Sequence, residues 1–165
     1  MTSDSDWEIQ LERIKTLRAA YCHALSETPE EDVWKKIEAW ARPRELLTPD
    51  KSTRIFGRNT YPTNNPEPHG YELFLTVDPS IDAEGGIKIK EIPGGLYAVL
   101  KSTSLERMGD AWRCLWNWVE DSGYEFVGWK KEEHGWVGGF EEHLNPFEGK
   151  PPADWLFNLW IPLKE

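Results

Sequence analysis

The sequence contains few cysteines and no long hydrophobic run. Only Cys22 and Cys114 occur among its 165 residues, and neither stands at the spacing of a disulfide framework or of paired metal ligands. No apolar stretch approaches the roughly 18 residues that cross a bilayer, and the first residues are acidic where a signal peptide is basic. These features predict a cytoplasmic protein with reduced thiols and no membrane association.

Basic residues are also scarce, since 19 Lys and Arg stand against 29 Asp and Glu, a formal net charge of −10. That charge repels a phosphate backbone, so direct DNA binding is not expected. A dinucleotide-binding glycine motif, a P-loop and a nucleophile elbow are all absent, and no cofactor is predicted. The triplets at 132–134 and 141–143 each read Glu-Glu-His. They lack the usual spacing of zinc ligands, and no metal is predicted.

Aromatic residues, in contrast, are abundant, with ten Trp, six Phe and five Tyr. Two segments carry apolar residues at helical spacing. In the first, 29–41, Thr28 can act as N-cap and Pro29 can take the first helical position. The second follows Gly109 and ends near residue 123. Tryptophans on the apolar faces of both helices are expected to pack in the core: Trp34, Trp40, Trp112 and Trp118. Trp116 lies off this stripe, which favours an exposed or interface position.

The remaining chain reads as short strands separated by turns. Strands are predicted at 17–25, 53–58, 71–77, 87–92, 96–102, 124–129, 137–144 and 156–161. Residues 1–16 are expected to form an arm or a short helix ahead of a single domain, 17–165. The order strand, helix, strand, strand occurs twice, and the helical segment 32–40 is matched by 110–118. This duplication predicts an α+β fold with pseudo-twofold symmetry, an antiparallel sheet with two helices, and a central ligand cleft.

These segments resemble a known family. The stretch 85–126, with Gly70-Tyr71-Glu72 before it and the strand at 140–145 after it, is similar to the GyrI-like small-molecule-binding family, which includes effector-binding domains of AraC-type and MerR-type regulators. The resemblance covers roughly 17–163. It implies a cleft for hydrophobic, often cationic aromatic compounds, with a carboxylate at the position of Glu141. No helix-turn-helix precedes the domain, so the chain resembles the stand-alone form.

Strand alternation leads to the same carboxylate independently. Glu141 and His143 share one face of their strand, and Phe140, Glu142 and Leu144 share a face suited to packing. A carboxylate in an aromatic setting favours a cationic ligand, to which each Trp or Tyr ring adds about 0.5–2 kcal/mol. The predicted ligand-binding residues are Glu141, His143, Tyr21, Phe56, Tyr71, Trp129, Trp136 and Trp160. For the aromatic residues among them, core packing is an equal alternative.

Two functions fit such a site. In the first, the chain captures hydrophobic or cationic aromatic molecules without altering them. In the second, suggested by cyclopropanoid hydrolases among stand-alone family members, Glu141 is a general base on water and a Tyr or His143 donates a proton. The residues show neither a positioned water nor a proton donor, so binding is favoured. A protein partner, as for the gyrase inhibitor protein of this family, is compatible with the acidic charge, which selects no particular partner.

Overall fold

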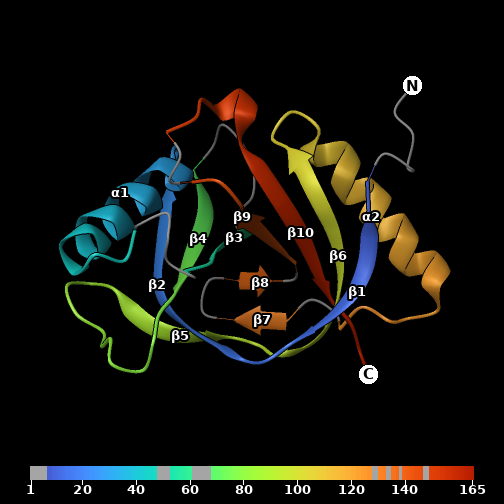
Figure 1. Cartoon of the computed structure of the whole chain (residues 1–165), viewed down its shortest axis with the longest axis horizontal. Coiled ribbons are helices and arrows are strands. Elements are labelled where there is room, and N and C mark those ends of the chain that lie inside the picture. Colours follow the sequence, from blue (N-terminus) through green and yellow to red (C-terminus); the bar gives the residue numbers. More distant parts are fainter. Residues whose placement is uncertain are drawn as a thin grey trace. The chain divides into compact units, whose positions relative to one another are not determined.

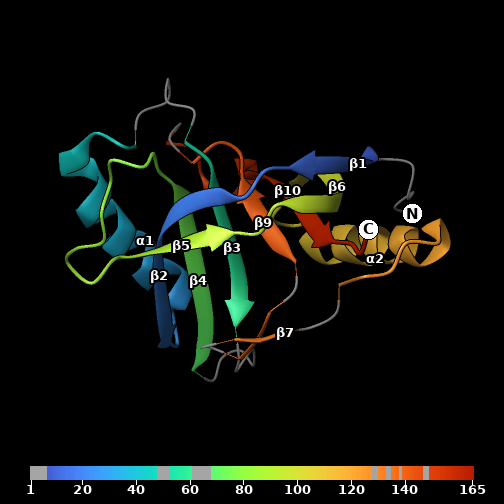
Figure 2. The same cartoon turned by 90° about the horizontal axis from the view of Figure 1, so that it is seen from below.

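The computed structural model describes residues 7–47, 53–60, 68–127, 130–132, 135–137, 139–146 and 149–165. Antiparallel strands and two α-helices make up the regular structure of these residues, which confirms the predicted α+β class (Figures 1 and 2). The chain divides into two compact units. Unit 1 comprises residues 1–15, 94–128 and 138–165, and unit 2 comprises residues 16–93 and 129–137.

The described residues of unit 2 contain one α-helix and an antiparallel sheet of strand order β3-β4-β2-β5. Its elements are β2 (Leu17–Ser26), α1 (Pro29–Ala41), a 3-10 turn (Arg42–Arg44), β3 (Ile55–Thr60), β4 (His69–Thr76) and β5 (Lys88–Ile92). A separate pair is formed by β7 (Lys130–Glu132) and β8 (Gly135–Val137). The predicted helix 29–41 and the first strand are thereby confirmed.

Helix α1 begins as its sequence predicts, with Thr28 at the N-cap and Pro29 in the first turn, but the Thr28 side chain makes no capping hydrogen bond. The helix packs on β2 and β4. Cys22 of β2 faces it, since its Sγ donates to the Val33 carbonyl oxygen at 3.6 Å. Burial raises the pKa of the Cys22 thiol to about 12, although nearby Lys36 opposes the shift. Alternation along the strands therefore separates an α1 face from a distal face of this sheet.

Unit 1 repeats the plan with strand order β1-β6-β10-β9. Its elements are β1 (Ile9–Ile14), β6 (Gly95–Ser104), α2 (Met108–Ser122), β9 (Phe140–His143), a 3-10 turn (Pro152–Asp154) and β10 (Leu156–Pro162). Within the segment that the sequence assigns to an arm or a short helix, residues 9–14 form a strand that pairs with β6. Of the predicted strand at 124–129, residues 124–127 form only an isolated bridge, Phe126 to Leu163.

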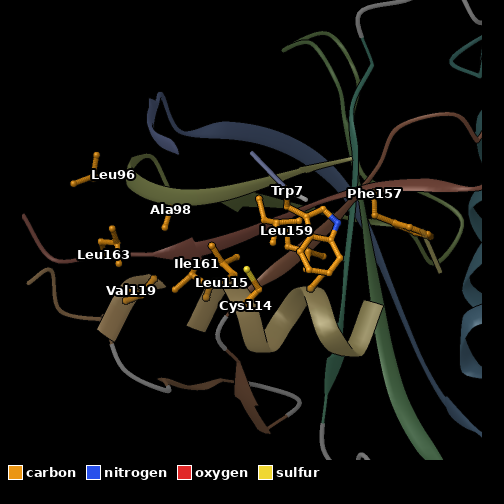
Figure 3. Packing of buried hydrophobic residues seen from close by; sticks show 12 residues of the cluster. Trp7, Leu96, Ala98, Cys114, Leu115, Val119, Phe157, Leu159, Ile161 and Leu163 are labelled. Carbon is orange, nitrogen blue, oxygen red and sulfur yellow. The ribbon is translucent and has the colours of Figure 1, made fainter. Parts of the chain in front are cut away.

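The core of unit 1 lies between α2 and its sheet (Figure 3). Leu115 from the helix and Leu159 and Ile161 from β10 are completely buried there. The helix tryptophans Trp112, Trp116 and Trp118 are half-buried against this cluster. Trp116 therefore packs on the core despite lying off the apolar stripe, and its ring meets Phe126 edge-on at 4.9 Å. Among the described residues no helix is long and apolar enough to span a membrane.

Candidate functional site

Strand β9 carries the carboxylates of interest, and its pairing with β10 decides which way they point. Phe140 lies opposite Trp160, Glu141 opposite Leu159, and His143 opposite Phe157. Directly opposed residues of antiparallel strands project to the same side of the sheet. Since Phe157 and Leu159 belong to the core against α2, Glu141 and His143 share the α2 side of unit 1. Glu142 projects to the other side, which we call the distal face of unit 1.

This arrangement corrects the face that the sequence pattern assigned to each side chain of β9. Glu142 was assigned to the packing face, yet it lies on the distal face with Phe140. A second observation supports the correction: a Cβ added to Gly139 would lie 2.9 Å from the Trp112 ring of α2, so Gly139, and with it Glu141, points toward the helix. Whether Glu141 contacts a ligand stays a prediction.

The distal face of unit 1 includes Tyr97, Phe140, Glu142 and Trp160, because Trp160 lies opposite both Phe140 and Val99, and Tyr97 lies two residues before Val99. The Glu142 side chain is buried, and its Oε1 accepts a hydrogen bond of 3.1 Å from the Trp160 indole N–H. The Trp160 ring meets Tyr97 edge-on at a centroid distance of 5.5 Å. An indole N–H satisfies a carboxylate lone pair without changing its charge. The face therefore combines aromatic rings with a carboxylate that has a neutral hydrogen-bond donor.

On the opposite side of β9, His143 packs on Phe157 with ring centroids 5.0 Å apart. Burial lowers the pKa of His143 from 6.5 to about 4, because an apolar environment disfavours the imidazolium. The imidazole is consequently neutral at pH 7 and is a weak proton donor there.

The distal face of unit 2 holds two of the other predicted site residues, Tyr21 and Phe56. Both are buried, and both lie beside Phe74: the Tyr21 and Phe74 rings are 5.1 Å apart, and Phe56 is the cross-strand partner of Phe74. Glu72 lies on the same face, opposite Arg58, and is 2% exposed. Its oxygens lie 3.4 Å from the Arg58 Nε and 3.5 Å from the Tyr21 hydroxyl.

Tyr71 is placed apart from these residues. Its cross-strand partner is Ala24. Ala24 lies two positions from Cys22 on β2, so both residues project toward α1. The ring fills the space next to Gly57, where a Cβ would overlap the Tyr71 hydroxyl group. Tyr71 therefore lies on the α1 face of unit 2 and not with Tyr21 and Phe56. Its role as a ligand contact stays a prediction.

Two predicted aromatic contacts cannot be placed. Trp129 lies outside the described residues, and for Trp136 only the backbone, in β8, is described. Within the part of the chain that the structure describes, no group of three His, Cys, Asp or Glu side chains could hold a metal ion.

The sequence interpretation gave no binding role to Glu142 or Arg58. Glu142 was missed because the sequence interpretation assigned the two faces of β9 the wrong way round. Side chains alternate along a strand, so such an error moves every side chain to the opposite face. Arg58 was missed because its pairing with Glu72 depends on the register between β3 and β4. The sequence repeat aligns Glu72 with Glu141, but the strand orders β5-β2-β4-β3 and β1-β6-β10-β9 match β4 with β10, so the two carboxylates are not structural counterparts.

The chain belongs to the GyrI-like family: the model of the GyrI-like small molecule binding domain matches residues 8–164. It is thus a small-molecule-binding domain. A comparison with curated proteins gives no match.

Several solved structures share the fold. The C-terminal domain of EcmrR is 16% identical with a TM-score of 0.69, and the match covers 96% of this chain and 98% of that domain. In the structure of the EcmrR–DNA complex the EcmrR chain is longer, and this chain spans 58% of its length. A hydrolase from Listeria innocua is 7% identical with a TM-score of 0.69, covering 95% and 92% of the two chains. SAV2435 bound to tetraphenylphosphonium is 11% identical with a TM-score of 0.55, covering 95% and 94%.

Proposed function

We propose that this chain captures hydrophobic, often cationic aromatic compounds, and that a carboxylate of β9 complements their positive charge. Membership of the small-molecule-binding family supports the general activity. A protein of the same fold, SAV2435, has been solved with the lipophilic cation tetraphenylphosphonium, which supports the ligand class. The observation that carries the proposal is the buried Glu142 among the aromatic rings of the distal face of unit 1.

The physical reason is the cost of burying a charge. A carboxylate removed from water is stabilised when a cation arrives, and the adjacent Trp160 and Tyr97 rings attract the same cation through their faces. Lys101 lies 5.9 Å from the centre of the Trp160 ring, but its ammonium group is also paired with Glu12. Among the described contacts of this region, Glu142 and Glu12 supply carboxylates and Lys101 supplies an ammonium group, which supports a cationic ligand over an anionic one.

The adjacent carboxylates of β9 provide a matched test. Binding of tetraphenylphosphonium is measured by quenching of tryptophan fluorescence, with tetraphenylmethane-type neutral analogues bearing solubilising groups as the uncharged control. Glu142→Gln is expected to weaken binding of the cation about tenfold, a typical loss for one charge-assisted contact, and to leave the neutral analogue unaffected. If Glu141→Gln has that effect and Glu142→Gln has none, the carboxylate predicted from the sequence is the binding group. Equal affinities in all three proteins would refute the charge complement.

A hydrolase remains the alternative function, with Glu141 as the general base. The low pKa of His143 counts against its expected part as proton donor, because a neutral imidazole gives up its N–H proton poorly near pH 7. Incubation with a cyclopropane-bearing alkylating compound, followed by mass spectrometry, separates the two functions. Ring-opened product in excess of the protein would establish turnover, whereas capture of the intact compound by the protein, with no product, supports binding.

A further inference from the structure

Strand β1 is the edge strand of unit 1, and among the described residues it pairs with β6 alone. The Lys101 N–H donates to the Glu8 carbonyl oxygen, so these two residues form a hydrogen-bonded pair of the ladder. Hydrogen-bonded and non-hydrogen-bonded pairs alternate in antiparallel strands. The residues of β1 whose backbone N–H and C=O groups point away from β6 are therefore Ile9, Leu11 and Arg13. These groups have no partner within the part of the chain that the structure describes.

The side chains of β1 suit contact with another strand. Leu11, at the centre of the outward-facing residues, is 38% exposed. The charged side chains of the strand are already paired within the chain, Arg13 with Glu165 and Glu12 with Lys101. A second strand would therefore meet an apolar residue and balanced charges. Outward backbone groups beside an exposed leucine form a template to which a strand can add.

The edge strand of unit 2 differs in this respect. β5 reads Lys-Ile-Lys-Glu-Ile, and lysines on an edge strand are a common means of preventing it from pairing with another chain. β1 reads Ile-Gln-Leu-Glu-Arg-Ile and contains neither lysine nor proline. Of these two edge strands, β1 is thus the one that lacks such protection.

A second copy of β1 fits this edge, and the charges of the strand select the register. Outward-facing residues must pair with each other in an antiparallel ladder. With a twofold axis at Leu11, this residue lies opposite its own copy, and the Gln10 amide lies opposite the Glu12 carboxylate, which accepts hydrogen bonds. Ile9 lies opposite Arg13, whose aliphatic stem can cover it. The neighbouring register has its axis at Glu12 and sets two copies of that carboxylate against each other, which is unfavourable.

We propose that the chain forms a twofold-symmetric dimer in which β1 of one copy pairs antiparallel with β1 of the other, centred on Leu11. The pairing satisfies the outward N–H and C=O groups of β1 and buries the two Leu11 side chains against each other. A single self-complementary surface serves both copies, as in isologous dimers. This inference goes beyond the proposed function, because it assigns a protein partner to a different strand of unit 1 and requires no bound small molecule.

Sedimentation equilibrium of the full chain, whose net charge is −10, tests the dimer at about 0.15 M salt, where exposed charges are screened beyond about 8 Å. The native chain is expected to dimerise with a Kd of about 10–100 µM, as suits a small interface. Leu11→Lys and Leu11→Glu each place like charges at the axis and are expected to weaken dimerisation about tenfold or more. An equimolar mixture of the two variants is expected to recover a heterodimer. Leu25→Lys is the matched control, since Leu25 is 57% exposed on another strand, β2.

Hydrogen exchange of backbone amides locates the contact. The amides of Ile9, Leu11 and Arg13 are expected to gain protection as the protein concentration rises. Those of Gln10 and Glu12 point toward β6 and are expected to keep the same protection. The inference is overturned if the native chain stays monomeric up to ~1 mM, if the Leu11 variants dimerise as tightly as the native chain, or if the outward amides gain no protection. Leu11→Lys is expected to bind tetraphenylphosphonium as the native chain does, so the dimer and the proposed function stand or fall separately.

Discussion

Replacing His143 with Gln is expected to change how the stability of the protein depends on pH. Burial beside Phe157 lowers the pKa of the imidazole from 6.5 to about 4 in the folded chain. Between these two values the unfolded chain binds a proton that the folded chain does not. Acidification therefore favours unfolding, and the free energy of unfolding falls as the pH drops below about 6.5.

The size of the effect follows from the shift in pKa. Each unit of difference is about 1.4 kcal/mol, so the change from 6.5 to about 4 corresponds to roughly 3 kcal/mol once both states are protonated. At pH 4.5 the loss is about 2.5 kcal/mol, because the folded imidazole is then only partly protonated. A glutamine at position 143 is neutral at every pH and lacks this contribution.

Urea unfolding of both proteins at pH 7.5, 6.5, 5.5 and 4.5, followed by tryptophan fluorescence, measures the difference. Carboxylates that titrate in this range are common to both proteins and cancel when the two free energies are subtracted. The difference in free energy of unfolding is expected to shift by about 2.5 kcal/mol in favour of the variant between pH 7.5 and 4.5. A difference that stays constant to within about 0.5 kcal/mol would show that the imidazole is well solvated, and would refute the reasoning.

Two further predictions concern packing and hydrogen bonding. Gly139→Ala should destabilise the fold by about 1–3 kcal/mol, because its Cβ would lie 2.6 Å from the Trp160 carbonyl oxygen and 2.9 Å from the Trp112 ring. Gly109→Ala, which meets nothing within 4 Å in α2, should raise the melting temperature, and a loss there would contradict the packing. Trp160→Phe should cost about 1–3 kcal/mol more than Trp40→Phe in urea unfolding. The Trp160 indole N–H has a buried carboxylate acceptor, whereas the Trp40 indole N–H has no hydrogen-bond partner among the described residues; equal costs would contradict this account.

Local pattern was sufficient to predict most of the elements. The helix at 29–41 is found with these bounds, because Pro29 in the first turn and a broad apolar face specify it locally. The second helix ends at Gly123 as expected, where a φ of 85° suits glycine. The strand predicted at 137–144 was less well defined, since the structure has β8 ending at Val137 and β9 beginning at Phe140. Gly139 lies between them and closely approaches the Trp160 carbonyl oxygen, a contact that no local pattern indicates.

The candidate site was predicted less completely than the fold. Aromatic residues and a carboxylate on β9 were predicted to form the site, and Trp160 lies beside Glu142, but their contact with a ligand stays a prediction. The side of the sheet occupied by each residue was not determined, however. Tyr71 and Tyr21 lie on neighbouring strands, yet they project to opposite faces of unit 2. Only the pairing of β2 with β4, and the packing of α1 on one side, decides which face each ring joins.

The amino-acid sequence by itself determined the family, the α+β class and the duplicated order of elements, because capping residues, helical spacing and strand alternation act over a few neighbouring positions. It also showed that acidic and aromatic groups occur together. Tertiary structure alone decided that Glu142 joins Trp160 and that Arg58 joins Glu72. The physical reason is that strand side chains alternate with a period of two, so the choice between adjacent residues such as Glu141 and Glu142 depends on register with partner strands distant in the chain.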